Sequence, residues 1–322
     1  MAQTSTAIPP IAAETGTKRM PKRGFAGRWR KSRYLLLMFL PCFVYFALFK
    51  YLPMFGIVIS FKNYNLYKGV WESSWVGLKY YRMFFENPDF FKLLRNTILL
   101  GFYKLLFGFP APLILALLLN ELKNAVFKRF VQTVSYLPHF ISNVVVASMV
   151  VLFLSPSTGA VNQLIAWLGF EPINFMVKPD LFRSIYVASE IWQHVGWETI
   201  IYLAALTAID PMLYEAAEID GAGRWRKLVH VTLPGIAPAI VILLILNVGK
   251  VLEIGFEKVF LLYNPATYET ADIISTYVYR VGLMEGNFSY ASAIDLFTGV
   301  VSLIFILATN AISRKVSETS LW

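Results

Sequence analysis

The chain has 322 residues, of which 57% are hydrophobic, 16% aromatic and only 15% charged. This composition is too apolar for an ordinary soluble domain and indicates an integral membrane protein. A formal net charge of +9 would also suit a protein that binds nucleic acid or anionic lipid. The basic residues are distributed as the topology of a membrane protein requires, so we favour that explanation of the charge. One cysteine, Cys42, excludes a disulfide framework, and three histidines without ligand spacing predict no metal site.

The first 33 residues are predicted to form a cytoplasmic tail. Residues 1–17 are rich in Ala, Thr, Ser and Pro, a composition typical of disorder. Basic residues then run from Lys18 to Arg33, with Phe25 and Trp29 among them, directly before an apolar segment. This order favours a basic interfacial membrane anchor over a nucleic-acid arm, and no signal-peptide cleavage pattern follows it.

Residues 34–322 are predicted to form one all-α, polytopic transmembrane domain with six spans. A helix needs roughly 20 apolar residues to cross a bilayer, and six segments are long enough. They lie near residues 34–59, 93–119, 133–154, 182–208, 236–262 and 293–313.

Six spans put both termini on the same side of the membrane. Three further basic groups share that side: Lys123, Lys128 and Arg129; Arg224, Arg226 and Lys227; and Arg314 and Lys315. The positive-inside rule makes that side cytoplasmic, although the first external loop also carries basic residues. Residues 61–92, expected outside, are rich in aromatic side chains, for which we favour interfacial anchoring over contact with a partner protein. Among them are Tyr64, Tyr67, Trp71, Trp75, Tyr80, Tyr81, Phe84 and Phe85.

Ionisable residues inside spans are candidates for a translocation pathway, because each costs roughly 2.5–3.5 kcal/mol at mid-bilayer unless it faces a cavity or a partner. At 1.5 Å rise per residue, groups from three spans reach similar depths in the outer half of the membrane. In the fifth span Lys250, Glu253 and Glu257 are spaced to share one helical face. The pathway candidates are Tyr103, Lys104, Glu190, Trp192, Gln193, His194, Trp197, Asn247, Lys250 and Glu253.

Two interpretations of these residues stay open. Hydroxyl partners together with flat aromatic faces would suit a sugar site. Alternatively, Lys250 and the two glutamates pair with each other, or with another membrane subunit, as structural contacts. Lys104 has no acidic residue one turn away in its own span, so an acidic ligand could supply the missing negative charge.

The segment from Glu215 to Pro234 is a polar island between two apolar runs. Asp210 and Pro211 provide a helix N-cap and first position, and Gly221 is expected to end the helix in a left-handed turn. A second short basic segment is predicted to follow and to end at Leu233-Pro234.

This segment resembles the signature of permease subunits of bacterial type I ABC importers, in the carbohydrate-uptake, maltose-permease-like family. The signature is Glu-Ala-Ala, three residues, Gly, nine residues, Ile, one residue, Leu-Pro, and Val231 in place of Ile is the only departure. The resemblance implies that an ATPase subunit contacts the coupling residues Glu215, Ala216, Ala217, Asp220, Gly221, Leu233 and Pro234.

Other strings extend the resemblance over roughly residues 70–320. The run Val76–Tyr81, with Asp89, Phe91 and Asn96-Thr97, and later Tyr136-Leu137-Pro138, resembles sugar-importer permeases. The string from Phe256 to Arg280 resembles the oligo- and polysaccharide branch, which includes alginate and aldouronate importers.

The resemblance implies a permease in the bacterial cytoplasmic (inner) membrane, with both termini inside, that forms half of a pathway for an oligosaccharide. The cationic groups of Lys104 and Lys250 favour an acidic sugar, alginate or another uronate type. Neutral plant-type oligosaccharides are the alternative. Its implied partners are a second, homologous permease, two ATPase subunits and an external solute-binding protein, with no nucleic acid.

We expect a transport subunit rather than an enzyme, with no catalytic residue and no cofactor. The chain lacks the GxxxxGK[ST] motif, so ATP and Mg are expected on the partner ATPase subunits. Two rival functions are a proton-coupled secondary transporter and a membrane-embedded, lipid-linked glycosyl or phosphoryl transferase. The second would need clustered acidic residues at a membrane face, which the sequence does not show.

Overall fold

The computed structural model describes residues 25–252 and 254–316, which fall into two compact units, Met1–Gly56 and Ile57–Trp322. In the first unit, α1 (Phe25–Phe46) continues through a π-helical turn (Ala47–Tyr51) into the short α2 (Leu52–Met54). A 3₁₀ segment, Phe55–Phe61, follows and enters the second unit. The apolar helical run Leu37–Phe61 is 25 residues long. Its most apolar stretch contains no buried residue, as expected for a helix that faces lipid or another chain.

The second unit is almost entirely helical. Its first strands and helices are β1 (Lys62–Asn65), α3 (Gly69–Glu72), β2 (Ser73–Trp75), α4 (Lys79–Phe85), α5 (Phe90–Tyr103), α6 (Pro110–Glu121), α7 (Ala125–Tyr136), α8 (Asn143–Phe153) and α9 (Ala160–Trp167). They are followed by α10 (Pro179–Thr207), α11 (Pro211–Ile219), α12 (Arg224–Lys227), α13 (Leu233–Gly249), α14 (Phe256–Leu262), α15 (Tyr268–Ala271), α16 (Ile274–Tyr279) and α17 (Phe288–Val316).

The helices confirm a membrane-type, all-α architecture. Among the described residues, four helical runs are long and apolar enough to cross a bilayer: Leu37–Phe61, Phe90–Glu121, Arg224–Gly249 and Phe288–Ile312. Two bent pairs raise the number to six if each is one span. These are residues 125–140 with 143–153, bent by 104°, and residues 179–207 with 211–219, bent by 68°.

The fifth predicted span is not one continuous helix. The helix α13 ends at Gly249, Lys250 has a non-helical backbone, and the chain resumes as α14 only at Phe256. The expected common face of Lys250, Glu253 and Glu257 is therefore wrong, since it assumed an unbroken helix; Glu253 itself lies outside the described residues. A close approach explains where the break lies, because a Cβ on Gly101 of α5 would lie 2.0 Å from the Val251 carbonyl oxygen.

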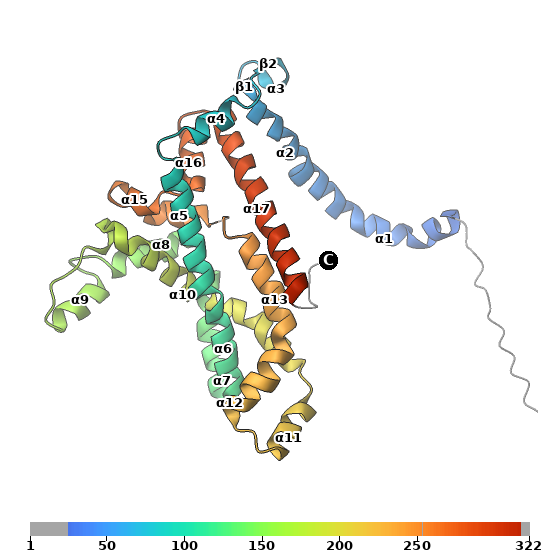
Figure 1. Ribbon diagram of the computed structural model, residues 1–322, viewed down its shortest axis with the longest axis vertical. Coiled ribbons are helices and arrows are strands. Elements are labelled where there is room, and N and C mark those ends of the chain that lie inside the picture. The colour runs from blue at the N-terminus through green and yellow to red at the C-terminus, as the bar shows by residue number, and fades with distance from the viewer. Residues whose placement is uncertain (1–24, 253, 317–322) are drawn as a thin grey trace, which may run out of the picture. The chain divides into compact units, whose positions relative to one another are not determined.

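Opposite ends of the second unit carry its two small peripheral structures (Figure 1). At one end, β1 and β2 pair antiparallel, with Lys62 opposite Trp75 and Asn63 opposite Ser74, and this hairpin lies near α4 and the start of α17. Ser289 fixes the hairpin, since its Oγ donates to the Lys62 carbonyl at 2.7 Å and accepts from the Tyr64 amide at 2.9 Å. At the other end lies α11.

Three buried clusters hold the second unit together. The first packs α4 and α5 against α16 and α17 around Phe84, Leu93 and Ile294. The second joins α5, α8, α10 and α14, with Tyr186 fully buried at its centre. The third joins α6, α10 and α13 through Tyr202 and Ile236. The helix α10 takes part in two of the three clusters, so it is the element that positions the polar groups described next.

Candidate functional site

The segment from Asp210 to Ala222 folds as its residue types predict. Asp210 Oδ1 accepts a hydrogen bond from the Met212 amide at 2.9 Å, and Pro211 occupies the first turn of α11. At the other end Gly221 has φ +72°. The Gly221 amide donates to the Glu218 carbonyl at 3.0 Å and the Ala222 amide to the Ala217 carbonyl at 2.8 Å, which is the Schellman arrangement. The predicted cap and left-handed stop are both confirmed.

The second half of the island does not stop at Leu233-Pro234. Residues 224–249 form one continuous helical run, in which a π-helical turn, Leu228–Thr232, stands directly before Leu233 and Pro234. The prediction that this pair ends the segment is therefore wrong. In a π-helical turn each N–H donates to the carbonyl five residues earlier instead of four. This change of partner lets the helix continue past a proline, which has no N–H to donate.

The helix α11 and the basic segment that follows it have an exposed and partly apolar surface. No residue of α11 is buried, and Met212, Leu213 and Ile219 are exposed beside Glu215 and Ala216. The two halves are tied together by an ion pair between Lys227 Nζ and Glu218 Oε1 at 2.6 Å and by a hydrogen bond between the Tyr214 and Thr232 hydroxyls at 3.0 Å. The Lys227 ammonium lowers the pKa of the Glu218 carboxyl. A rigid surface of this kind suits docking to another protein.

A polar cavity of about 190 Å³ lies within the second unit. Five of the ten pathway candidates line it: Lys104, Glu190, His194, Asn247 and Lys250. They come from the π-helical turn after α5, from α10 and from the end of α13. Glu198, one turn beyond His194 on α10, also lines the cavity and was not among the candidates, although its i, i+4 spacing from His194 was available in the sequence.

Glu190 is an ion-pair partner of two lysines at once. Its Oε2 lies 2.9 Å from Lys104 Nζ, and its Oε1 lies 2.6 Å from Lys258 Nζ on α14. The side chain of Lys258 is only 2% exposed, whereas that of Lys104 is 42% exposed. The expectation that Lys104 lacks a negative partner is thus wrong, because the partner comes from a different helix. Sequence reasoning missed Lys258, since its contact requires α14 to fold back after the break at residues 250–255.

Two histidines and a tryptophan pack beside this cluster. His139 and His194 approach through their Nδ1 atoms at 3.1 Å, and His194 Nε2 lies 3.9 Å from Glu190 Oε1. The His139 ring stacks on Trp197 with centroids 4.6 Å apart and planes within 1°. Trp197 is therefore brought to the cluster by its ring contact with His139, and it is not among the residues that line the cavity.

The remaining candidates lie elsewhere. Gln193 is buried and donates to the Ile141 carbonyl at 3.0 Å and to Asn143 Oδ1 at 3.2 Å, so it supports the bend between α7 and α8. Trp192 lines a separate apolar cavity of about 490 Å³ between α8, α9 and α10. Tyr103 packs against the second buried cluster. Glu257, which we expected near Lys250, instead accepts a hydrogen bond from Asn143 Nδ2 at 2.6 Å.

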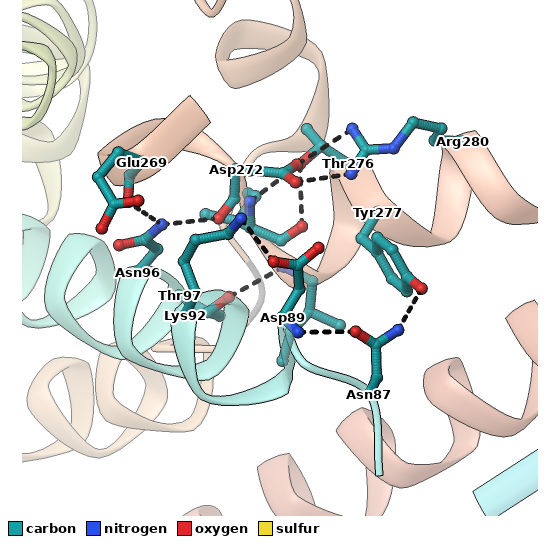
Figure 2. A network of polar contacts seen from close by, with 12 residues as sticks. Asn87, Asp89, Lys92, Asn96, Thr97, Glu269, Asp272, Thr276, Tyr277 and Arg280 are labelled. Carbon is teal, nitrogen blue, oxygen red and sulfur yellow. Dashed lines mark hydrogen bonds and ion pairs between the residues drawn. The ribbon is translucent and has the colours of Figure 1, made fainter. Parts of the chain in front are cut away.

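A polar network fastens the segment 269–280 to the beginning of α5 (Figure 2). Asn96 Nδ2 donates to the carbonyls of Glu269 and Asp272, both at 3.0 Å, while Thr97 Oγ1 accepts from the Ile274 amide at 3.0 Å. Asp272 in turn pairs with Arg280 at 2.6 Å and accepts from Thr276 at 2.8 Å. The motif residues Asn96-Thr97 therefore have a structural function, which is to hold the segment that leads from the cavity to α17.

Comparison with known proteins gives one consistent result. The family described as binding-protein-dependent transport system inner membrane component matches residues 108–318. The polygalacturonan/rhamnogalacturonan transport system permease protein YteP of Bacillus subtilis (strain 168) is 49% identical over 292 residues, which is 91% of each protein. Protein LplB of the same organism is 48% identical over 293 residues, 91% of this chain and 92% of that protein.

Solved structures agree with the sequence relatives. A chain in the crystal structure of a bacterial alginate ABC transporter, in complex with alginate pentasaccharide-bound periplasmic protein, superimposes with a TM-score of 0.86. It is 42% identical, and the match covers 93% of this chain and 100% of that chain. A second alginate importer structure gives a TM-score of 0.84 at 43% identity, over 90% of this chain and 98% of that one.

Proposed function

Because the chain belongs to the family of binding-protein-dependent transport system inner membrane components, and is the permease of a sugar ABC importer, we propose that it carries an acidic oligosaccharide of the uronate type. The cavity lined by Lys104, Glu190 and Lys250 is the part of the pathway where this sugar binds.

The charge of the cavity region supports this choice. Glu190 is shared between two lysines, and Lys250 and Glu198 line the same cavity. Among the described residues of this region, three ammonium groups and two carboxylates leave a formal charge of +1. A sugar carboxylate would balance that charge, and a lysine can hold a carboxylate as a flexible point charge. The named substrates of the similar proteins, polygalacturonan or rhamnogalacturonan and alginate, support the same class.

The chain is a transport component, and the energy comes from other polypeptides. The complex has two ATPase subunits that hold ATP and Mg, and one of them docks on the exposed surface of α11, with the coupling residues at or near the contact: Glu215, Ala216, Ala217, Asp220, Gly221, Leu233 and Pro234. A second, homologous permease completes the pathway, and an external solute-binding protein delivers the sugar. The crystallised complex of a similar transporter with a periplasmic protein supports that arrangement. Closure of the ATPase subunits moves α11, and the spans rock to open the cavity outward.

The test is a reconstituted complex of the chain, its second permease, the ATPase and the binding protein in lipid vesicles. We expect ATP hydrolysis to be stimulated by acidic oligosaccharides of defined length more strongly than by neutral ones of matched length. Stimulation by neutral sugars alone would refute the acidic substrate class and would favour the neutral oligosaccharides instead.

A further inference from the structure

We infer that Lys258, which does not line the cavity, sets the charge of the cavity and so determines its selectivity for acidic over neutral sugars. This inference rests on the proposed function, and it assigns a specificity-determining role to a buried residue that a transported sugar does not reach.

The geometry of Glu190 is the first step. Each of its two oxygens faces a different ammonium group, Oε2 at 2.9 Å from Lys104 and Oε1 at 2.6 Å from Lys258. The side chain of Glu190 is 10% exposed, so neither oxygen is well solvated. One carboxylate can neutralise one ammonium group but not two. The three groups together therefore keep one positive charge.

The burial of the two lysines decides where this charge is felt. Lys258 is almost completely buried and cannot exchange Glu190 for water, and a buried charge that loses its partner is strongly destabilised. Lys104 is 42% exposed and lines the cavity, so it can exchange Glu190 for a solvated or substrate carboxylate. Lys258 thus holds Glu190, and Lys104 is the group left available to an entering anion.

Removing Lys258 would reverse this balance. Glu190 would then neutralise Lys104 alone. The formal charge of the described groups of this region, which is +1 with Lys258 counted beside Lys104, Lys250, Glu190 and Glu198, would fall to zero. In a partly buried site, the loss of one positive charge is large enough to change the affinity for an acidic sugar relative to a neutral one by about tenfold. The loss would apply to acidic sugars only, since a neutral sugar has no carboxylate to be attracted.

The experiment compares Lys258→Met with the unchanged complex in the same reconstituted vesicles. The measured quantity is the ratio of half-stimulating concentrations of a neutral and an acidic oligosaccharide of matched length. We expect this selectivity ratio to fall about tenfold in Lys258→Met and to be kept in Lys258→Arg, which retains the charge. The matched control is Lys92→Met, which removes a lysine paired with Asp89 at 2.7 Å, away from the cavity.

A second variant separates charge from packing. The pair Glu190→Gln with Lys258→Met removes one charge of each sign and restores the formal +1, so its selectivity is expected to return to within about twofold of the unchanged complex. An unchanged ratio in Lys258→Met, or a lost selectivity in the double variant, would overturn the assignment. If Lys258→Met does not assemble, the double variant is compared with Glu190→Gln alone: removal of Lys258 then lowers the formal charge from +2 to +1, and an equal selectivity ratio in these two variants would overturn the assignment. Absence of any acidic preference in the unchanged complex would refute the proposed function instead.

Discussion

At the scale of single residues, Asn96 shows how few contacts fix the segment that follows the helix break. It is fully buried, its amide donates to two backbone carbonyls, and its Oδ1 accepts from Arg183 at 2.9 Å. Leaving a buried carbonyl without a donor costs about 1–3 kcal/mol.

Asn96→Ala is expected to lower the free energy of unfolding by about 2 kcal/mol or more, because two carbonyls and the Arg183 guanidinium lose a partner. Thermal unfolding in detergent measures the effect, and increased proteolysis at residues 269–274 would accompany it. Asn174→Ala is the control, since Asn174 is exposed whereas Asn96 is fully buried. Equal unfolding temperatures for the two variants would show that the network contributes no stability.

Gly221 carries a conformational constraint in the segment that we propose contacts an ATPase subunit. Its positive φ disfavours a residue with a Cβ by roughly 1–2 kcal/mol, although no atom lies within 4 Å of the place where a Cβ would be. We expect Gly221→Val to leave the chain inserted and to abolish sugar uptake, because α11 would no longer end where it does. Gly223→Ala, at a position with extended backbone and open space, should transport normally. Normal uptake by Gly221→Val would contradict the coupling role, and Glu215→Lys provides an independent variant with the same expected loss.

At the scale of elements, the break between α13 and α14 decides which groups meet in the cavity. It turns the chain so that Ile254 lines the cavity and Lys258 reaches Glu190 on α10. Gly101 permits the break to lie directly against α5.

Gly101→Ala should therefore displace the Val251 carbonyl and cost about 1–3 kcal/mol of stability, the usual range for an overpacked site. The same displacement should weaken sugar-stimulated ATP hydrolysis, since Lys104 and Lys250 flank the contact. Gly299→Ala on α17 has no atom within 4 Å of the added Cβ and is the matched control. If the two alanine variants unfold at the same temperature, the close approach of α5 to residue 251 is not a constraint.

The elements also show what local sequence could and could not predict. The cap at Asp210, the left-handed Gly221 and the helical span regions follow from residue types over a few positions, and the structure has them. The break after Gly249 was missed because an apolar run of this length favours a continuous helix. The Lys104–Glu190–Lys258 cluster was missed because ion pairs between helices depend on packing, which periodicity within one helix does not describe.

At the scale of the whole molecule, α10 links the cavity to the exposed helix α11. The middle of α10 carries Glu190, His194 and Glu198 to the cavity, and its C-terminal end leads through Asp210 into α11. A displacement of α11 by an ATPase subunit would act on a helix that takes part in two of the three buried clusters. This connection is the physical basis on which we propose that ATP hydrolysis changes access to the cavity.

The central claim is that Lys104 in the cavity binds the acidic sugar. The most direct test measures uptake of a labelled acidic oligosaccharide into vesicles that contain the reconstituted complex, with Lys104→Gln in place of the unchanged chain. Lys92→Gln serves as the control, because its single ion pair lies away from the cavity. We predict that Lys104→Gln raises the KM for the acidic sugar about tenfold and leaves uptake of a neutral sugar of matched length unchanged. An unchanged KM for the acidic sugar in Lys104→Gln would contradict the account.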